Sequence, residues 1–269
     1  AENSTGQREI LTGEIIVSRL QQPVRPLRKS MWPVPDKPIL SEEEYAKYFP
    51  MDERGNNDPL QWKKSKEVFR SKFDLARDSV FRPSVSEWAS GQYLLEVHSR
   101  DKFGNDVKIV RPIVLYGAAE KTSPVMDPFW IKPVHVNAEP GSNDTILLAT
   151  GENELTVLYE LEHRAKIIRR EWITLNKEQK LLIIPVEEAW RGNATVHFVA
   201  VKNNREYKTD ETLIVPWTNK ELEITLQTFR NKAEPGSKEE WNVVVKGKKG
   251  EMVDAEMLAS MYVASLDGF

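Results

Sequence analysis

Ala138-Glu139-Pro140-Gly141-Ser142 occurs a second time, as Ala233-Glu234-Pro235-Gly236-Ser237. The two copies are 233 − 138 = 95 residues apart, close to the ~100 residues of one immunoglobulin-like β-sandwich. In each copy proline fixes φ at the first central position of a turn and glycine supplies positive φ at the second, so we expect two type II turns. The repeat predicts the same turn in two consecutive sandwich modules, and a structural role explains it better than a ligand-binding loop.

The composition is typical of a folded chain with an ordinary charged surface. The 269 residues suffice for two domains or slightly more, and an apolar fraction of 40% suffices for a packed core. The net charge of 38 − 41 = −3 gives no field that would attract nucleic acid or acidic lipid. No apolar run approaches the length of a membrane-spanning helix. The absence of cysteine excludes disulfides, thiolate metal sites and cysteine nucleophiles.

The clearest module covers residues 122–218. Seven short alternating segments separated by polar turns match the strand count of an immunoglobulin-like sandwich. Asn203-Asn204 fits a two-residue hairpin loop, because asparagine tolerates positive φ. The predicted strands are Ile131–Asn137, Thr145–Ala149, Leu155–Glu162, Lys166–Thr174, Lys180–Pro185, Ala194–Lys202 and Arg205–Val215.

Residues 1–121 predict a first β-module with a helical insert at about 41–75. Gly13–Leu20 is rich in β-branched residues and is typical of a strand. Gln92–Ser99 and Val107–Tyr116 predict a hairpin around Gly104. Five prolines between positions 23 and 38 favour an extended, irregular segment.

Two helices are expected within the insert. Ser41-Glu42-Glu43-Glu44 forms a capping box. Asp58-Pro59 is typical of a second helix start, and Trp62, Phe69 and Phe73 fall on one apolar stripe of that helix. The opposite face is basic, and the overall acidic balance favours an ordinary helix surface over a polyanion site. Its residues are Lys63, Lys64, Lys66, Arg70 and Lys72.

A third segment, residues 219–269, predicts the beginning of a further module. Leu222–Leu226 and Trp241–Val245 alternate like strands on either side of the second turn, and Lys248-Lys249-Gly250 turns the chain into Met252–Met261. From Lys220 the segment has 269 − 220 + 1 = 50 residues, whereas a full module needs about 100. We therefore expect a piece of a longer protein.

No combination of residues predicts a catalytic, cofactor-binding or metal-binding site. Nucleotide-binding glycine loops and the Gly-x-Ser-x-Gly elbow are absent from the sequence. The adjacent acids Glu187-Glu188 and Asp210-Glu211 would point to opposite faces of a strand, so they cannot converge on one glycosidic bond. The four histidines share no i, i+4 spacing, which disfavours a zinc site. They are His98, His135, His163 and His197.

Eight tryptophans are the most unusual feature of the composition. Trp172 and Trp241 lie in strand patterns and are expected in the core. The others lie near turns, helices or module joints, where packing is the favoured interpretation and stacking against sugars is the alternative. They are Trp32, Trp62, Trp88, Trp130, Trp190 and Trp217.

The third segment resembles a macroglobulin module. The resemblance is carried by Leu222–Leu226, Glu234-Pro235-Gly236, Lys249–Met257 and Tyr262–Asp267, with Val263 where the family frequently has aspartate. The insert is similar to one found in bacterial alpha-2-macroglobulin-like proteins, particularly those of the Bacteroidetes type. Its matching stretches are Arg28–Asp36, Ser41–Tyr45 and Phe49-Pro50, and the hairpin at Gly91-Gln92-Tyr93 and Asp101–Asn105 is similar as well.

This resemblance implies an all-β fold of tandem immunoglobulin- or fibronectin-III-like macroglobulin sandwiches. It implies a non-catalytic scaffold fragment of a proteinase-trapping protein, in which cleavage of a bait segment releases a conformational change. Many members react through a Cys-Gly-Glu-Gln thioester, which a cysteine-free sequence excludes from these residues. The implied partners are proteinases, through the full-length protein, and neighbouring macroglobulin domains, with no nucleic acid and no cofactor. The implied location is the periplasm or cell surface, with any lipid anchor outside these residues, and a glycan-binding or adhesion module is the alternative.

Overall fold

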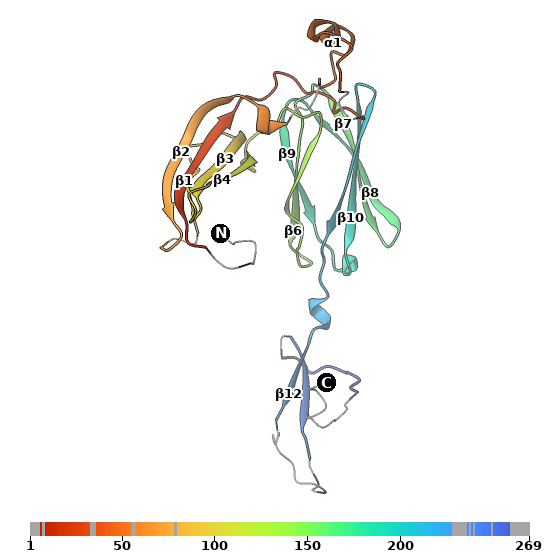
Figure 1. The fold of residues 1–269 in the computed structure, drawn as a ribbon. Helices are drawn as coiled ribbons and strands as arrows, with labels where there is room; N and C mark the ends of the chain where they lie inside the picture. Colours follow the sequence, from red (N-terminus) through yellow and green to blue (C-terminus); the bar gives the residue numbers. More distant parts are fainter. Residues whose placement is uncertain are drawn as a thin grey trace.

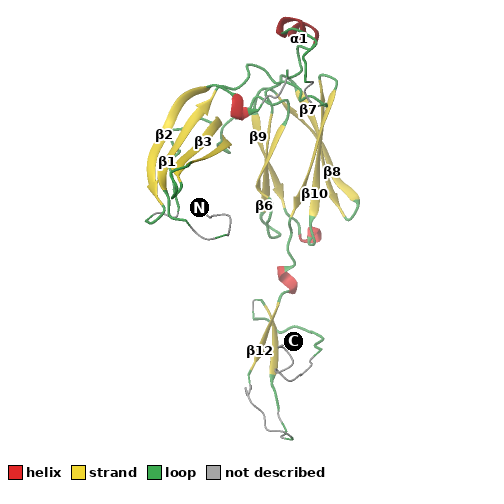
Figure 2. Ribbon diagram, in the orientation of Figure 1, coloured by secondary structure: helices red, strands yellow, loops and turns green. Residues whose placement is uncertain are grey.

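The computed structural model describes residues 6, 9–32, 36–54, 58–77, 80–227, 236, 238, 240–248 and 250–258. Its strands form antiparallel sheets, and the expected all-β class is confirmed (Figure 2). Figure 1 shows three groups of strands, with a central sandwich between a curved sheet and a separate hairpin. Among the described residues no helix is both long and apolar enough to cross a membrane.

The central sandwich consists of two sheets with the strand orders β5-β6-β9 and β11-β10-β7-β8. All seven predicted strands are confirmed, with ends that differ by a few residues. A short 3-10 helix, η2 (Glu188–Trp190), connects β9 to β10. The strands are β5 (Trp130–His135), β6 (Asn143–Ala149), β7 (Leu155–His163), β8 (Lys166–Leu175), β9 (Gln179–Pro185), β10 (Ala194–Lys202) and β11 (Arg205–Leu213).

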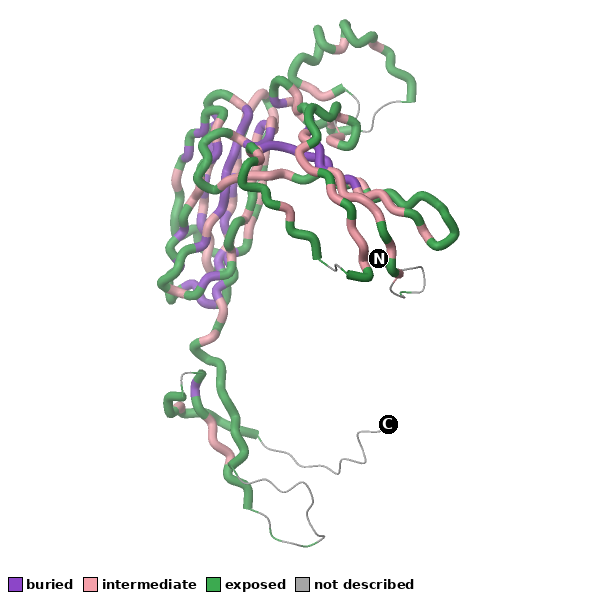
Figure 3. Tube along the Cα trace, turned by 90° about the vertical axis from the view of Figure 1, so that its left-hand side faces the viewer, coloured by how far each residue is buried: buried purple, intermediate pink, exposed green. Residues whose placement is uncertain are grey.

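The core of the sandwich follows from strand alternation. Along β7 every second residue from Leu155 to Leu161 is fully buried, and Tyr159 pairs with the equally buried Phe198 of β10. Full burial of such side chains stabilises the fold by roughly 1.5–3 kcal/mol each. Figure 3 shows that most of the buried residues lie in the sandwich.

The predicted turns of the sandwich have the expected geometry. Ser142 N donates to Glu139 O at 3.0 Å and Gly141 has φ of +87°, as a type II turn requires. Asn203 and Asn204 both have positive φ and close the β10–β11 hairpin as a two-residue loop. Of the second pentapeptide, only Gly236 is among the described residues, and its φ is +82°.

A second hairpin repeats the register of β5–β6. It is formed by β12 (Leu222–Leu226) and β13 (Val243–Gly247), which follow the 3-10 helix η3 (Thr218–Lys220). Ile131 pairs with Leu148; residues 95 positions further on are Leu226 and Val243, and these pair with each other. The register therefore agrees at the two pairs that the hairpins have in common, Trp130–Ala149 with Thr225–Val244 and Ile131–Leu148 with Leu226–Val243. Beyond β13, Met252 forms only an isolated bridge with Lys246, and residues 253–258 form no strand.

The first group of strands is a single sheet with the order β2-β1-β3-β4. The early strand and the late hairpin are confirmed, and Gly104 closes the latter at φ of +86°. Ser41 caps α1 (Glu42–Tyr48) with both hydrogen bonds of the predicted capping box. The four strands are β1 (Thr12–Leu20), β2 (Lys64–Asp74), β3 (Gly91–Arg100) and β4 (Asp106–Leu115).

The predicted second helix is wrong. Asp58 caps only a short 3-10 helix, η1 (Pro59–Gln61), after which β2 pairs along β1. Phe69 and Phe73 are four residues apart, and that spacing puts two side chains on one face of a strand as well as of a helix. Pairing with the backbone of β1 favours the strand over the helix.

Candidate functional site

One arginine joins the insert of the first module to the sandwich. The Arg28 guanidinium donates to both carboxylate oxygens of Asp52, at 2.7 and 2.8 Å. Its Nη1 also donates to the carbonyl of Asn203, in the β10–β11 turn, at 2.5 Å. Arg205 Nη1 reaches the Lys29 carbonyl at 3.2 Å beside it. The bidentate pair fixes the guanidinium plane, so we regard this contact as a geometrically defined joint.

Residues 117–127, between the first sheet and the sandwich, are hydrogen-bonded to both neighbouring modules. The buried Gln179 amide donates to the carbonyls of Gly117 and Glu120 at 2.6 and 2.7 Å. From the other side, Gln22 donates to Pro124 O at 3.0 Å and accepts from Met126 N at 2.8 Å. These bonds satisfy backbone groups that a free spacer would leave to water.

A second arginine organises the opposite end of the sandwich. Arg191 is buried, and its Nε donates to Glu188 Oε1 at 2.6 Å. Its Nη1 donates to Glu139 Oε2 at 3.2 Å and to the Pro216 carbonyl. Thr218 Oγ1 donates to the same Glu139 oxygen at 2.8 Å. The acid of the repeated pentapeptide thus holds the linker that leads to β12.

The electrostatics of this second joint favour ionised Glu139. The hydrogen bond from Thr218 and then that from Arg191 lower the pKa of the carboxyl against the effect of burial. Trp217 lies over Gly192, where an added Cβ would stand 3.1 Å from the indole ring. Lys220 Nζ lies 4.4 Å from the centre of the same ring. No pattern in the sequence predicted the contacts of either joint.

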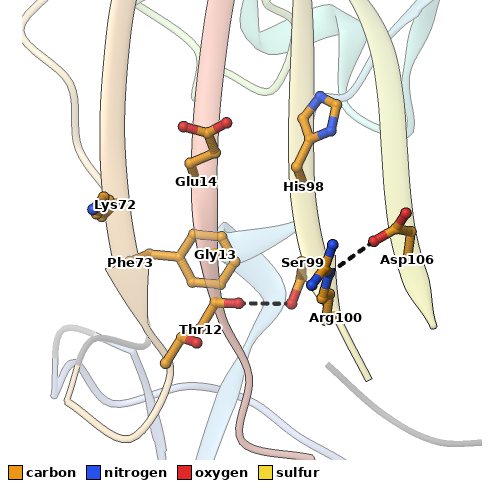
Figure 4. A pocket seen from close by; sticks show the side chains of 9 residues that line it. All are labelled: Thr12, Gly13, Glu14, Lys72, Phe73, His98, Ser99, Arg100 and Asp106. Atoms are coloured by element: carbon orange, nitrogen blue, oxygen red, sulfur yellow. Dashed lines mark hydrogen bonds and ion pairs between the residues drawn. The ribbon is translucent and has the colours of Figure 1, made fainter. Parts of the chain in front are cut away.

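A hollow of about 440 Å³ lies on the first sheet and brings together candidate acid–base groups (Figure 4). Ser99 and His98 are neighbours on β3 and point to opposite faces, and the Ser99 hydroxyl donates to Thr12 O at 2.8 Å. Glu14 is paired with Arg70 at 2.8 Å. The serine is therefore not aligned with a base, and the hollow has the side chains of a catalytic site without the geometry of an activated nucleophile.

Each of the four histidines lies in a strand and has a polar neighbour. The most connected is His197, which is 2.7 Å from Asp210 Oδ1 and 3.2 Å from Glu162 Oε2. The hydrogen bond with Asp210, and then that with Glu162, raises the pKa of His197 against the effect of burial. His135 Nδ1 lies 3.3 Å from the buried Asp144. Within the described ranges no group of three or more such side chains could hold a metal ion.

Some members of the charged clusters noted in the sequence form ion pairs, and two of the clusters lie on other elements than predicted. The basic residues assigned to a helix lie on or beside β2, where Lys64 pairs with the buried Glu96 of β3; Lys108 of β4 pairs with the same carboxylate. Burial would raise the pKa of Glu96, but hydrogen bonds from the two lysines outweigh it and lower the pKa. Glu187-Glu188 lies at η2 instead of a strand, because Glu188 is held by Arg191.

The tryptophans contradict the expected core positions. Trp172 is 68% exposed, because the alternation of β8 directs Ile173 and Leu175 inward and Trp172 outward. Trp241, outside β13, is exposed as well, whereas Trp190 is buried in the core. A glycan platform would need a row of indoles. On this sheet face Trp172 instead stands beside Leu158 of β7, with which it pairs.

Comparison with known proteins gives a family match and distant likenesses to solved structures. Residues 130–265 match the family described as alpha-2-macroglobulin bait region domain, which is 265 − 130 + 1 = 136 of 269 residues. No curated protein matches the chain.

Among solved structures, the chain is similar to a tetra-tandem repeat in the extending region of a large adhesion protein. Identity is 12% and the TM-score 0.30, over 88% of this chain and 56% of that one. It is also similar to the native conformation of E. coli alpha-2-macroglobulin, at 12% identity and a TM-score of 0.25. That likeness covers 89% of this chain and 16% of that one.

Proposed function

The chain belongs to the alpha-2-macroglobulin family through its bait region domain, and from this premise we propose that it is part of the non-catalytic scaffold of a proteinase-trapping protein. The family match over residues 130–265 is the observation that carries the proposal. In this proposal the chain contributes three modules to the scaffold, residues 1–121, 122–218 and 219–269. The Bacteroidetes type stays a prediction.

The two arginine joints support a mechanical role. A trap must convert one cleavage into movement of whole modules, and movement passes between modules only where they are firmly connected. Arg28 connects the insert to one end of the sandwich, and Arg191 connects the linker to the other end. Each joint depends on one charged side chain with several partners, so it can break and re-form as a unit. In this function the scaffold carries the movement and contributes no reacting group.

The experiment that tests trapping uses the full-length protein and trypsin. We expect a proteinase complex in native gels, slower digestion of a large protein substrate, and continued hydrolysis of a small peptide substrate by the trapped enzyme. Arg191→Gln should weaken the protection of the large substrate. Arg169→Gln, which removes an exposed pair with Glu171, is the matched control and should leave protection unchanged. Equal digestion of both substrates with no complex would reject the proposal.

We propose an exported location, in the periplasm or at the cell surface, because proteinase trapping is useful where foreign proteinases arrive. Any lipid anchor would belong to polypeptide outside these residues. Cell fractionation with an antibody against the chain tests this proposal. Recovery in the cytoplasmic fraction alone would contradict it.

A further inference from the structure

The first sheet has the same strand order as one sheet of the sandwich. Its order β2-β1-β3-β4 corresponds to β8-β7-β10-β11, strand for strand in chain order and in pairing. In each sheet the first strand pairs with the second and the third, and the last two form a hairpin. The two sheets are therefore topological equivalents.

Among the described residues, only the sheet of the sandwich is covered by a second layer of strands (Figure 2). In the sandwich, β5, β6 and β9 cover the inner face of the sheet, and β9 lies between β8 and β10 in the chain. In the first module, residues 80–90 take that place without forming a strand. Phe81 lies 5.2 Å from Phe69, and Trp88 lies 5.6 Å from Tyr93, between ring centres. Among the described residues, nothing corresponds to β5 and β6.

An apolar hollow marks the uncovered area. Ile15 and Val97 pair at its centre and are half-buried, whereas the paired Tyr159 and Phe198 of the sandwich are fully buried. Ile109 of β4 is 49% exposed at its edge. The hollow measures about 230 Å³. It is lined by Leu11, Ile15, Phe73, Leu75, Val80, Phe81, Val97, Ser99, Val107 and Ile109.

We propose that this face binds a two-stranded antiparallel β-ribbon equivalent to β5–β6, supplied by polypeptide that precedes β1. The chain order of the sandwich gives the source, because β5 and β6 precede β7, and β7 corresponds to β1. The ribbon presents alternating apolar side chains, as Ile146 and Leu148 of β6 do in the sandwich core. A strand ribbon of this kind converts the single sheet into a sandwich, whether or not the protein traps proteinases.

The absence of cysteine allows a direct test. Ile109→Cys places a thiol on the open face, and Ile168→Cys places one on the exposed face of β8; the native residues are 49% and 47% exposed. Thiol modification by a bulky maleimide is compared between the 269-residue chain and a longer polypeptide that continues upstream. We expect the thiol of Ile109→Cys to react roughly tenfold more slowly in the longer polypeptide. The thiol of Ile168→Cys should react at the same rate in both.

Three results would overturn the proposal. Equal rates for Ile109→Cys in the two polypeptides would show that no upstream ribbon covers the face. Protection in the short chain at every concentration would show that its own residues cover it. Protection that grows with the concentration of the short chain would identify a second copy as the occupant. Val107→Cys lies on the same face and repeats the measurement if Ile109→Cys does not fold.

Discussion

The hairpins β5–β6 and β12–β13 have the same turn sequence and, at the two pairs that they have in common, the same register, but different surroundings. Leu148 is fully buried, whereas its counterpart 95 residues later, Val243, is half-buried. Every residue of β12 is exposed. The comparison separates what determines the turn and the strand pairing from what determines whether a side chain joins a core. The turn and the pairing are set locally by the pentapeptide and the alternation that flanks it, whereas core membership depends on a facing sheet.

Removing matched apolar side chains should give the largest difference between the hairpins. Leu148→Ala should destabilise the sandwich by about 2–5 kcal/mol, because it leaves a cavity in a closed core. Val243→Ala should lower the stability of the sandwich by less than about 0.5 kcal/mol, because the side chain lies outside that core. Urea unfolding followed by circular dichroism measures both. Equal losses would show that the second hairpin shares the core of the sandwich.

Substitutions of the glycines in the two turns test backbone strain without changing buried contacts. Gly141 and Gly236 have φ of +87° and +82°, and an added Cβ would meet no atom within 4 Å at either position. Only backbone strain is left, so Gly141→Ala should cost the sandwich about 1–2 kcal/mol. Gly236→Ala should leave the unfolding midpoint of the sandwich unchanged. A loss of several kcal/mol for Gly141→Ala would mean that the turn makes contacts beyond its own backbone.

A buried acid distinguishes β6 from β12 in a pH-dependent way. Asp144 is fully buried, and within the described part of the chain its carboxylate oxygens have no hydrogen bond, although His135 is near. Burial raises the pKa of Asp144, and His135 offsets this only in part. The folded state therefore binds this proton more tightly than the unfolded state, and stability falls as pH rises from the unfolded to the folded pKa.

Asp144→Asn should consequently stabilise the sandwich by about 1 kcal/mol at pH 8, and the gain should shrink as pH falls through the raised pKa of Asp144. Melting temperatures measured across this pH range test the prediction. Glu223→Gln changes an exposed carboxylate of β12 and serves as the control, with little change expected. Destabilisation by Asp144→Asn at pH 8 would show that the ionised form is favoured in the fold.

Sequence-based prediction succeeded where local interactions determine the structure and failed where distant segments determine it. The seven sandwich strands were predictable because alternation and turn residues are local signals. The second helix was not, since Phe69 and Phe73 fit both periods and β1 decided between them. Trp172 was misplaced because aromatic character was given more weight than the parity that Leu175 sets on the same strand. Each of these errors lies where a distant segment, or the choice of strand face, overrides the local pattern.

The contacts made by the joint residues had no local signal in the sequence. Arg28 contacts Asn203, which is 175 positions away, and Arg191 contacts Glu139 across 52 positions. Neither arginine stands in a recognisable motif, and only the packing of modules brings the partners together. The sterics of the turn account for Pro140 and Gly141 and assign no role to the Glu139 carboxylate, which accepts from Arg191 and Thr218.

The smallest energetic effect concerns the joint between the two hairpins. Glu139→Gln removes the negative charge that accepts from Thr218 and Arg191, while the turn itself keeps its shape. Ile168→Cys and Ile224→Cys, both at exposed positions, carry spin labels on either side of the joint. We expect a broader distance distribution between the labels and an unchanged melting temperature, because the bonds lost orient the linker without closing the core.

Lowering the pH should also broaden the distance distribution between the spin labels in the protein that keeps Glu139. The lowered pKa of Glu139 means that its contribution is present above the ordinary carboxyl pKa and is lost only as pH falls through the lowered value. Broadening that begins well below that ordinary pKa in the native joint, and is present at every pH in Glu139→Gln, would assign it to this carboxylate. The same pH dependence in both proteins would place the flexibility elsewhere in the linker. The acid of the pentapeptide would then act in the turn alone, and the two copies would differ only in the sheet that faces them.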